Sequence, residues 1–232
     1  MSAHLASSTY TYAPALFAPH PWSTPATDGR IDREGASAAG AVLCFAQDRE
    51  IYGEGDAANS FFKVVAGVVR TCKFLSDGRR QIEGFHVAGD VFGFEAGAEH
   101  RLSAEAVCDC RLTSHRRRGL EQLAATDLAL SQQLLSYAMR GMTRAQDHSL
   151  LLGRKSAVEK VAAFLIECAQ HSAGCQTITL AMTRQDIADY LGLTIETVSR
   201  TLSQLEREAV IEIPTARQIR FKDPAALQNL NS

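Results

Sequence analysis

The sequence predicts an α+β fold: an N-terminal β-roll of the jelly-roll type, then a long helix, then a C-terminal winged helix-turn-helix. Short apolar runs alternate with glycine-containing turn signals from residue 41 to about residue 118, which is typical of many short strands. Apolar residues then recur at steps of three and four up to residue 152, as in one long helix. Near the C-terminus, two short helical patterns joined by a glycine turn precede a strand pair.

The composition limits the classes of protein to consider. The 232 residues are 46 % hydrophobic and 22 % charged, as in ordinary globular proteins, and the net charge is −2. An interface with DNA would have to come from one local face, because the chain lacks a basic excess. No apolar run reaches the length of a membrane span, and residues 1–21 lack the pattern of a secretory signal. The six cysteines include no Cys-x-x-Cys pair, so we expect reduced thiols and a cytoplasmic protein.

We divide the chain into four segments. Residues 1–38 are rich in Ala, Ser, Thr, Pro and Gly and predict a mostly disordered arm. Residues 39–118 form the expected β-roll, in which the pair Asp77-Gly78 between two strand-like runs signals a hairpin. Residues 119–153 form the long helix, and residues 154–232 form the winged helix-turn-helix.

The long helix carries one apolar seam. Such a seam favours packing against a second copy of the helix, since the β-roll would have to be very elongated to cover all of it. Packing of the same face on the β-roll is the alternative. Arg144 makes the seam imperfect, and a break is expected at Gly153. The expected dimer contacts are Leu130, Leu134, Tyr137, Gly141, His148 and Leu152.

One stretch near the C-terminus predicts the helix-turn-helix. Thr183 and Asp186 resemble a capping box, with Asp in place of the usual Glu or Gln, and start a helix over Arg184–Leu191. Gly192 closes that helix, as a left-handed C-terminal residue does, and Thr194 caps a second helix that runs to about residue 207. The expected buried face of the first helix is Ile187, Ala188 and Leu191.

The second helix has two chemically distinct faces. Glu196, Ser199 and Arg200 share the outer face in its first two turns, the part of a recognition helix that enters the major groove. Arginine can bind guanine, glutamate can accept from cytosine, and serine tolerates several partners. The alternative is an i, i+4 salt bridge between Glu196 and Arg200 on a solvated helix; the capped helix before it and the strand pair after it favour base reading. The inward face is Val198, Leu202 and Leu205.

Phosphate contacts have to come from one face, because residues 154–232 hold nine Lys and Arg against nine Asp and Glu. The segment VIEIPTARQIRFKD predicts a two-stranded wing whose cations could reach phosphates, and backbone amides at helix starts could add contacts. A solvated surface charge is the alternative for each basic residue. The candidates are Thr183, Arg184, Thr194, Thr197, Arg217, Arg220 and Lys222.

Several segments resemble the CRP/FNR superfamily over roughly residues 41–225. The order of β-roll, long helix and winged helix-turn-helix is that of the superfamily, and E-T-V-S-R at residues 196–200 resembles the E-x-x-S-R of its FNR and FixK branches. The segments SDGRRQIEGF, GDVFGFEAG and LLLGRKSAVEKVAAFL resemble the FixK branch most closely.

The resemblance implies a cyclic-nucleotide-binding-like β-roll and a homodimer on double-stranded DNA. The operator would be a palindrome with TTGA-type half-sites, and the regulator would act as an activator that recruits RNA polymerase. FixK proteins generally bind DNA without a cofactor and control genes of microaerobic respiration, nitrogen fixation or denitrification.

Departures from the family pattern set the expectations for cofactors. The first cysteine is Cys44, so the N-terminal cysteine cluster that holds iron and sulfur in FNR has no counterpart here. Gly93 is followed by Phe94 where cyclic-AMP-binding relatives have Gly-Glu, and the segment at Arg101 carries an extra residue. We therefore expect no cofactor, although Arg101 and Glu95 could still line a cavity.

The remaining cysteines and histidines leave two competing functions. An effector-gated regulator of the same superfamily would respond to a small ligand or to thiol redox state, for which Cys175 is a candidate. A cupin-like enzyme with an attached DNA-binding domain would need clustered histidines, and His86 and His100 are isolated. Cys108 and Cys110 lie in a strand-like stretch without a histidine pair nearby, so we expect buried thiols and no metal. We expect no enzymatic activity.

Overall fold

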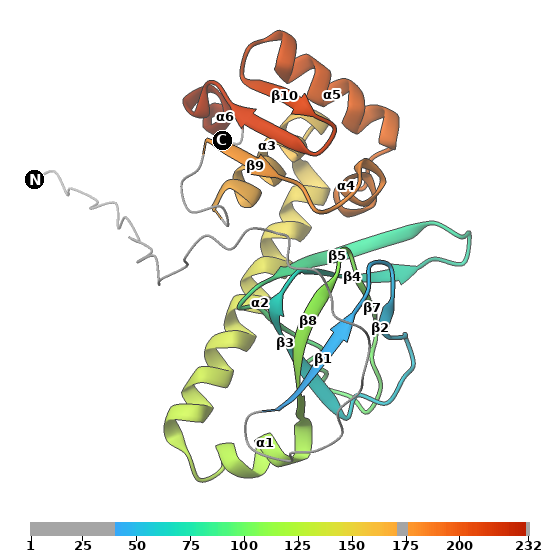
Figure 1. Cartoon of the computed structure of the whole chain (residues 1–232), viewed down its shortest axis with the longest axis vertical. Coiled ribbons are helices and arrows are strands. Elements are labelled where there is room, and N and C mark those ends of the chain that lie inside the picture. Colours follow the sequence, from blue (N-terminus) through green and yellow to red (C-terminus); the bar gives the residue numbers. More distant parts are fainter. Residues whose placement is uncertain (1–39, 171–175, 231–232) are drawn as a thin grey trace, which may run out of the picture.

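The computed structural model describes residues 40–170 and 176–230, and the expected arm at residues 1–38 and Cys175 lie outside these ranges. Two lobes, a β-roll and a smaller helical domain, are connected by a long helix that runs along one side of the β-roll (Figure 1). The predicted α+β fold, with β-roll, long helix and winged helix-turn-helix in this order, is confirmed. Among the described residues, no helix has the length and apolarity needed to cross a membrane.

The β-roll consists of two four-stranded antiparallel sheets, in the orders β1-β8-β3-β6 and β2-β7-β4-β5. The hairpin predicted at Asp77-Gly78 joins β4 to β5, and Gly78 has the positive φ of 83° that its turn requires. The strands are β1 Ala41–Phe45, β2 Glu50–Tyr52, β3 Ser60–Ala66, β4 Val68–Phe74, β5 Arg80–Val87, β6 Val91–Phe92, β7 Ser103–Ala106 and β8 Cys110–Arg116.

Two helices follow where the sequence predicted one: α1 spans Arg117–Ala124 and α2 spans Leu128–Arg154. The chain breaks at Asp127, because its carboxylate accepts the Leu130 amide at 3.1 Å and starts a new helix there. The break expected at Gly153 comes two residues later, at the extended Lys155, and Gly153 itself is the second-last residue of α2.

The C-terminal domain consists of four helices and a three-stranded sheet of order β10-β11-β9. The helix-turn-helix pair, α4 and α5, begins and ends at the predicted residues, because each boundary is set by a local cap. The elements are α3 Ala157–Gln170, β9 Thr177–Thr179, α4 Arg184–Leu191, α5 Ile195–Arg207, β10 Ile211–Thr215, β11 Gln218–Phe221 and α6 Pro224–Asn229.

Strand β4 of the β-roll contributes side chains to an apolar core that the two lobes share. Its five residues from Val68 to Cys72 are all buried, which is typical of a strand that is covered on both faces. The side chains on one face of β4 lie in the core of the β-roll, and those on its other face pack toward the C-terminal domain. As a result, one continuous apolar cluster contains Val68 and Ile82 of the β-roll together with Ile187 and Leu191 of α4. Burial of this cluster attaches the helix-turn-helix to the β-roll.

Candidate DNA-reading surface

Helix α4 is set by a complete capping box. The Thr183 hydroxyl accepts the Asp186 amide at 3.1 Å, and the Asp186 carboxylate accepts the Thr183 amide at 2.9 Å. The predicted inward residues are buried, and Gly192 ends the helix with a φ of 60°. The capping box and the glycine C-cap expected from the sequence are confirmed, so the turn into α5 is fixed at both of its ends.

Helix α5 has one buried face and, opposite it, one exposed face. Val198, Leu202 and Leu205 are buried as predicted. Thr194 caps the helix by accepting the Thr197 amide at 3.2 Å. These contacts fix the rotation of α5 about its own axis, and with it the direction of the opposite face.

The outer face of α5 consists of Glu196, Ser199 and Arg200, all of which are exposed. Among the ion pairs of residues 40–170 and 176–230, none joins Glu196 to Arg200, so the intrahelical salt bridge that the sequence left open is not formed. Hydrogen bonds from the Glu196 backbone and from the Thr194 side chain hold the pKa of the Glu196 carboxyl below its usual value. The face therefore presents an anion, a hydroxyl and a guanidinium, the groups suited to base edges.

The candidates for phosphate contact fall into two groups. A shallow hollow of about 190 Å³ between the start of α4 and the wing turn brings Thr183, Arg184 and Arg217 together. Burial lowers the pKa of the half-buried Arg184, and the Arg217 guanidinium donates to the Ala181 carbonyl at 3.3 Å. Thr194 and Thr197 lie together at the start of α5, where their hydroxyl oxygens are 3.1 Å apart.

The wing cations are partly neutralised within the chain. Glu212 on β10 accepts a hydrogen bond from Arg220 at 3.0 Å and lies 3.6 Å from the Lys222 ammonium. Both cations are about half exposed, so they can exchange this carboxylate for a phosphate. A composition argument could not show this pairing, because it depends on the register of β10 and β11.

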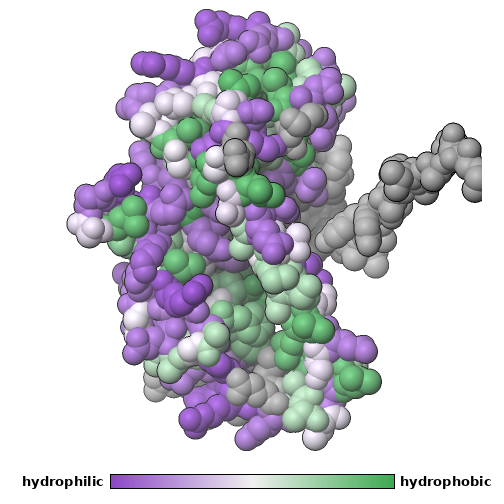
Figure 2. Space-filling model, turned by 180° about the vertical axis from the view of Figure 1, so that it is seen from behind, coloured by the Kyte–Doolittle hydropathy of each residue, from purple (hydrophilic) through white to green (hydrophobic). Residues whose placement is uncertain are grey.

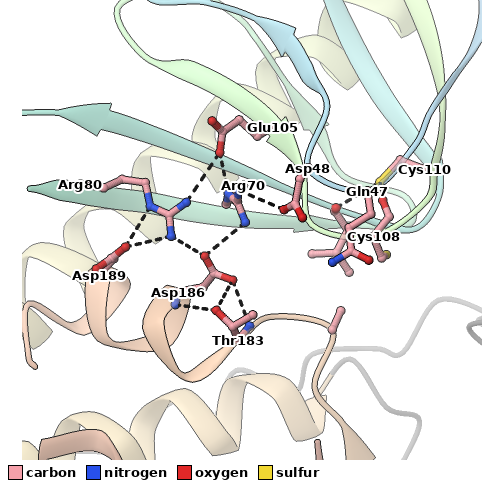
Figure 3. A network of polar contacts seen from close by, with 12 residues as sticks. Gln47, Asp48, Arg70, Arg80, Glu105, Cys108, Cys110, Thr183, Asp186 and Asp189 are labelled. Atoms are coloured by element: carbon pink, nitrogen blue, oxygen red, sulfur yellow. Dashed lines mark hydrogen bonds and ion pairs between the residues drawn. The ribbon is translucent and has the colours of Figure 1, made fainter. Parts of the chain in front are cut away.

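A set of ionic contacts between the lobes was not predicted from the sequence (Figure 3). Arg70 on β4 lies 3.2 Å from Asp186 on α4, and Arg80 on β5 lies 2.9 Å from Asp189. Glu105 on β7 accepts from Arg70 at 2.7 Å. We call these five residues the interdomain ion cluster. The only local signal for it was an arginine inside the long apolar run that forms β3 and β4.

In the C-terminal half of α2, side chains of the seam predicted for dimerisation contact other parts of the same chain and are not available to a partner. His148 stacks on Tyr190 of α4 with ring centroids 4.2 Å apart, and Leu152 lies against Gly192. Arg144 pairs with Asp90 of the β-roll at 2.7 Å. The seam's assignment to a dimer interface stays a prediction; Leu130, Leu134 and Tyr137 are half-buried, and Gly141 is exposed.

A different strip of α2 is both apolar and exposed, about 150° around the helix from the predicted seam. From behind, apolar side chains gather along the side of the molecule where α2 runs (Figure 2). The large exposed residues of the strip are Leu128, Leu135, Met139, Met142 and Leu150. Exposed apolar patches of this kind mark interaction surfaces.

The interior of the β-roll is filled by aromatic rings. Tyr52 stacks on His100 with centroids 3.6 Å apart and also contacts Phe62 and Phe92. Arg101, which was expected to be able to line a cavity, points outward, with 86 % of its side chain exposed and its guanidinium 3.6 Å from Glu95. Across residues 40–170 and 176–230, no three His, Cys, Asp or Glu side chains are grouped closely enough to hold a metal ion.

The two thiols of the Cys-Asp-Cys segment interact, although only one of them lies in a strand. Cys110 begins β8, whereas Cys108 lies in the bend before it. The Cys110 thiol donates to the Cys108 carbonyl at 2.9 Å. A hydrogen bond between the two side chains lowers the pKa of the Cys108 thiol to about 7, which makes it the more reactive of the pair.

Comparison with known proteins gives consistent matches for both lobes. Residues 42–127 match the cyclic nucleotide-binding domain, and residues 159–230 match the Crp-like helix-turn-helix domain. The chain is 47 % identical over 201 residues to the nitrogen fixation regulation protein FixK of Azorhizobium caulinodans, covering 84 % of this chain and 81 % of that protein. It is 44 % identical over 189 residues to FixK of Rhizobium meliloti, covering 82 % and 86 % of the two chains. The solved structure of FixK2 from Bradyrhizobium japonicum superposes with a TM-score of 0.80 at 45 % identity, over 83 % of this chain and 98 % of that one.

Proposed function

The chain belongs to the CRP/FNR family of transcription regulators, and on this premise we propose that it binds, as a homodimer, an inverted repeat of TTGA-type half-sites and activates transcription there. It is a DNA-binding regulator related to FixK and not an enzyme. The exposed face of α5 carries the proposal, because Glu196, Ser199 and Arg200 stand on a helix whose opposite face is buried.

Each residue of that face has a role in the proposal. Arg200 reads a guanine through its fork of donors, Glu196 accepts from a cytosine amino group, and Ser199 supports either contact. Thr183, Arg184 and Arg217 bind phosphate around their common hollow, and Arg220 and Lys222 do so from the wing. Base contacts supply specificity, and the phosphate contacts fix the register of the helix on the duplex.

The homodimer would form through α2. We place the partner on the exposed apolar strip of that helix, because the upper part of the opposite seam is already occupied by contacts within the chain. Two recognition helices on a two-fold axis would reach successive major grooves about 34 Å apart, which is why a palindrome is the expected operator.

We further propose that DNA binding needs no cofactor, since rings occupy the interior of the β-roll. The relatives' names point to genes of nitrogen fixation, and the FixK resemblance adds microaerobic respiration and denitrification. An activator of this kind would act in the cytoplasm with RNA polymerase as its partner.

A second candidate, regulation by thiol redox state, is favoured by one observation. Cys108 has a lowered pKa and a neighbouring thiol, and it packs against the apolar cluster that connects the two lobes. A hydroperoxide would oxidise the Cys108 thiolate to a sulfenic acid, which the Cys110 thiol could convert to a disulfide with loss of water. Peroxide treatment that leaves DNA affinity and protein mass unchanged would exclude this candidate.

The test of the main proposal is a gel-shift titration with reduced, ligand-free protein. One duplex carries TTGA, six spacer bases and TCAA; in the control duplex one half-site is scrambled. Selective binding of the intact palindrome is the expected result. Equal binding of both duplexes would refute sequence-specific reading by a dimer, whereas selectivity that appears only after a ligand is added would support an effector-gated regulator.

A further inference from the structure

Helix α4 is attached to the β-roll at both of its ends. At the C-terminal end, the ring of Tyr190 lies 5.2 Å from Phe85 of β5, centroid to centroid. At the N-terminal end, the contacts are ionic and involve Asp186 and Asp189. Because α5 follows α4 after a turn of three residues, any change in the orientation of α4 is passed directly to the base-reading face.

Asp186 contributes to two structures at once (Figure 3). Its Oδ2 accepts from the Thr183 amide at 2.9 Å and from the Thr183 hydroxyl at 2.7 Å, which completes the cap of α4. Its Oδ1 accepts from Arg70 at 3.2 Å and also from Arg80. The start of the helix-turn-helix is therefore hydrogen-bonded directly to two strands of the β-roll.

Burial makes these ionic contacts selective for one geometry. The side chains of Arg70 and Asp186 are 9 % and 3 % exposed. Buried ion pairs gain little net stability, because desolvation offsets the attraction, but a displaced partner leaves an uncompensated charge. Guanidinium groups also require their acceptors in a fixed plane. An apolar contact such as that of Phe85 with Tyr190 tolerates sliding, whereas the interdomain ion cluster does not.

We propose that Arg70 and Arg80 are positioning residues for DNA reading, which hold α4, and through it the recognition helix, in one orientation without a bound effector. Neither arginine touches DNA in this proposal. It rests on the proposed function, since the orientation matters only if two recognition helices bind one palindrome. The cluster fixes the spacing between the two helices, and thereby the number of bases that the protein accepts between half-sites.

The experiment compares palindromes with five, six and seven spacer bases, and a duplex with a single TTGA half-site. The variants are Arg80→Gln, Arg70→Met and Asp189→Asn; the last keeps the capping box of α4 intact. Arg79→Gln is the matched control, because Arg79 lies on the same hairpin, is 77 % exposed and pairs only with Asp77 among the contacts described. Hydrogen exchange of the free proteins is measured over α4, β5 and α5.

The variants are expected to lose about tenfold or more in affinity for the optimal palindrome and to discriminate less between spacer lengths. Their affinity for the single half-site should stay close to that of the unmodified protein, since one recognition helix needs no fixed spacing. Hydrogen exchange should rise in α4 and β5 and stay low in the α5 core. The Arg79→Gln control should behave as the unmodified protein in every assay.

Unchanged spacer preference in Arg80→Gln and Asp189→Asn would overturn the inference. Equal losses on palindrome and half-site, with faster exchange throughout α5, would also overturn it, because they indicate a purely structural role. If the unmodified protein binds no palindrome, the proposed function fails. Hydrogen exchange then still tests whether the two arginines hold α4. Equal protection of α4 in Arg80→Gln and in the Arg79→Gln control would reject that role.

Discussion

His148 of α2 stacks on Tyr190 of α4 almost in parallel, with ring centroids 4.2 Å apart and planes 8° apart, and its Nε2 lies 2.8 Å from the Tyr190 carbonyl oxygen. The helix expected to make dimer contacts thus also attaches the DNA-reading domain of its own chain. This contact and the interdomain ion cluster fix α4 from two directions.

Replacement of His148 by alanine should lower the free energy of unfolding by about 1 kcal/mol, because the ring pair with Tyr190 is removed. Urea unfolding followed by circular dichroism measures this decrease. Sedimentation should show no change in the oligomeric state. A His148→Ala protein that dissociates at concentrations where the unmodified protein is dimeric would instead place this residue in the dimer interface, as the sequence predicted.

The exposed apolar strip of α2 should be the dimer interface. Leu135 is 62 % exposed, and a Leu135→Glu change would introduce two like charges across a two-fold axis. We expect its dimer dissociation constant, measured by sedimentation, to rise by about tenfold or more. Gln133→Glu adds the same charge at an exposed position of α2 that points away from the strip, and serves as the control. If Leu134→Glu dissociates the dimer and Leu135→Glu does not, the original seam is the correct one.

Arg200 should discriminate between bases and not merely bind phosphate. Replacement by alanine is expected to cost about 1–3 kcal/mol at the specific operator and to relax the preference for one guanine. Lys222→Ala is the comparison, since removing a wing cation that binds phosphate should weaken binding to all sequences alike and reduce its salt dependence. Titrations against operators substituted at single positions separate the two patterns. An equal decrease on all sequences for Arg200→Ala would assign it to the phosphate backbone.

The Thr183 cap should contribute to both stability and DNA affinity. Thr183→Ala removes the hydroxyl that accepts the Asp186 amide and donates to the Asp186 carboxylate, so a loss of about 1 kcal/mol in unfolding free energy is expected. Thr183→Ser keeps the hydroxyl and should retain most of the stability. Thermal unfolding of the two proteins side by side tests this, and equal losses would show that the methyl group rather than the cap matters.

Local chemistry explains which parts of the molecule could be predicted. The bounds of α4 and α5 were correct because Thr183, Gly192 and Thr194 set them within a few residues of sequence. The break before α2 was missed, since Asp127 interrupts an apolar pattern that continues in the same period on both sides. The Arg70–Asp186 contact could not be predicted from the sequence, because the partners are 116 residues apart along the chain and no local pattern links them.

The last prediction concerns pH and follows from the surroundings of Asp186. Burial by itself would raise the pKa of this carboxyl, but the hydrogen bonds from Thr183 and the charges of Arg70 and Arg80 outweigh burial and hold it below its usual value. A carboxyl whose pKa is lower in the folded state contributes stability above its unfolded pKa, which for Asp is about 4. That contribution is lost as the pH falls from about 4 through the folded pKa.

We therefore expect the difference in unfolding free energy between the unmodified protein and Asp186→Asn to be largest at neutral pH and to shrink below about pH 4. Urea titrations at a series of pH values measure it, with Asp77→Asn as a control for an exposed carboxyl whose pKa is also lowered. Asp77 pairs only with its neighbour Arg79 among the described contacts, so its replacement should not change protection of α4 against hydrogen exchange. Asp186→Asn should reduce that protection at neutral pH and leave it unchanged in acid, because the protonated carboxyl no longer carries a charge for Arg70 and Arg80. A difference that is constant across the whole pH range would mean that the Asp186 charge contributes nothing to the attachment of α4.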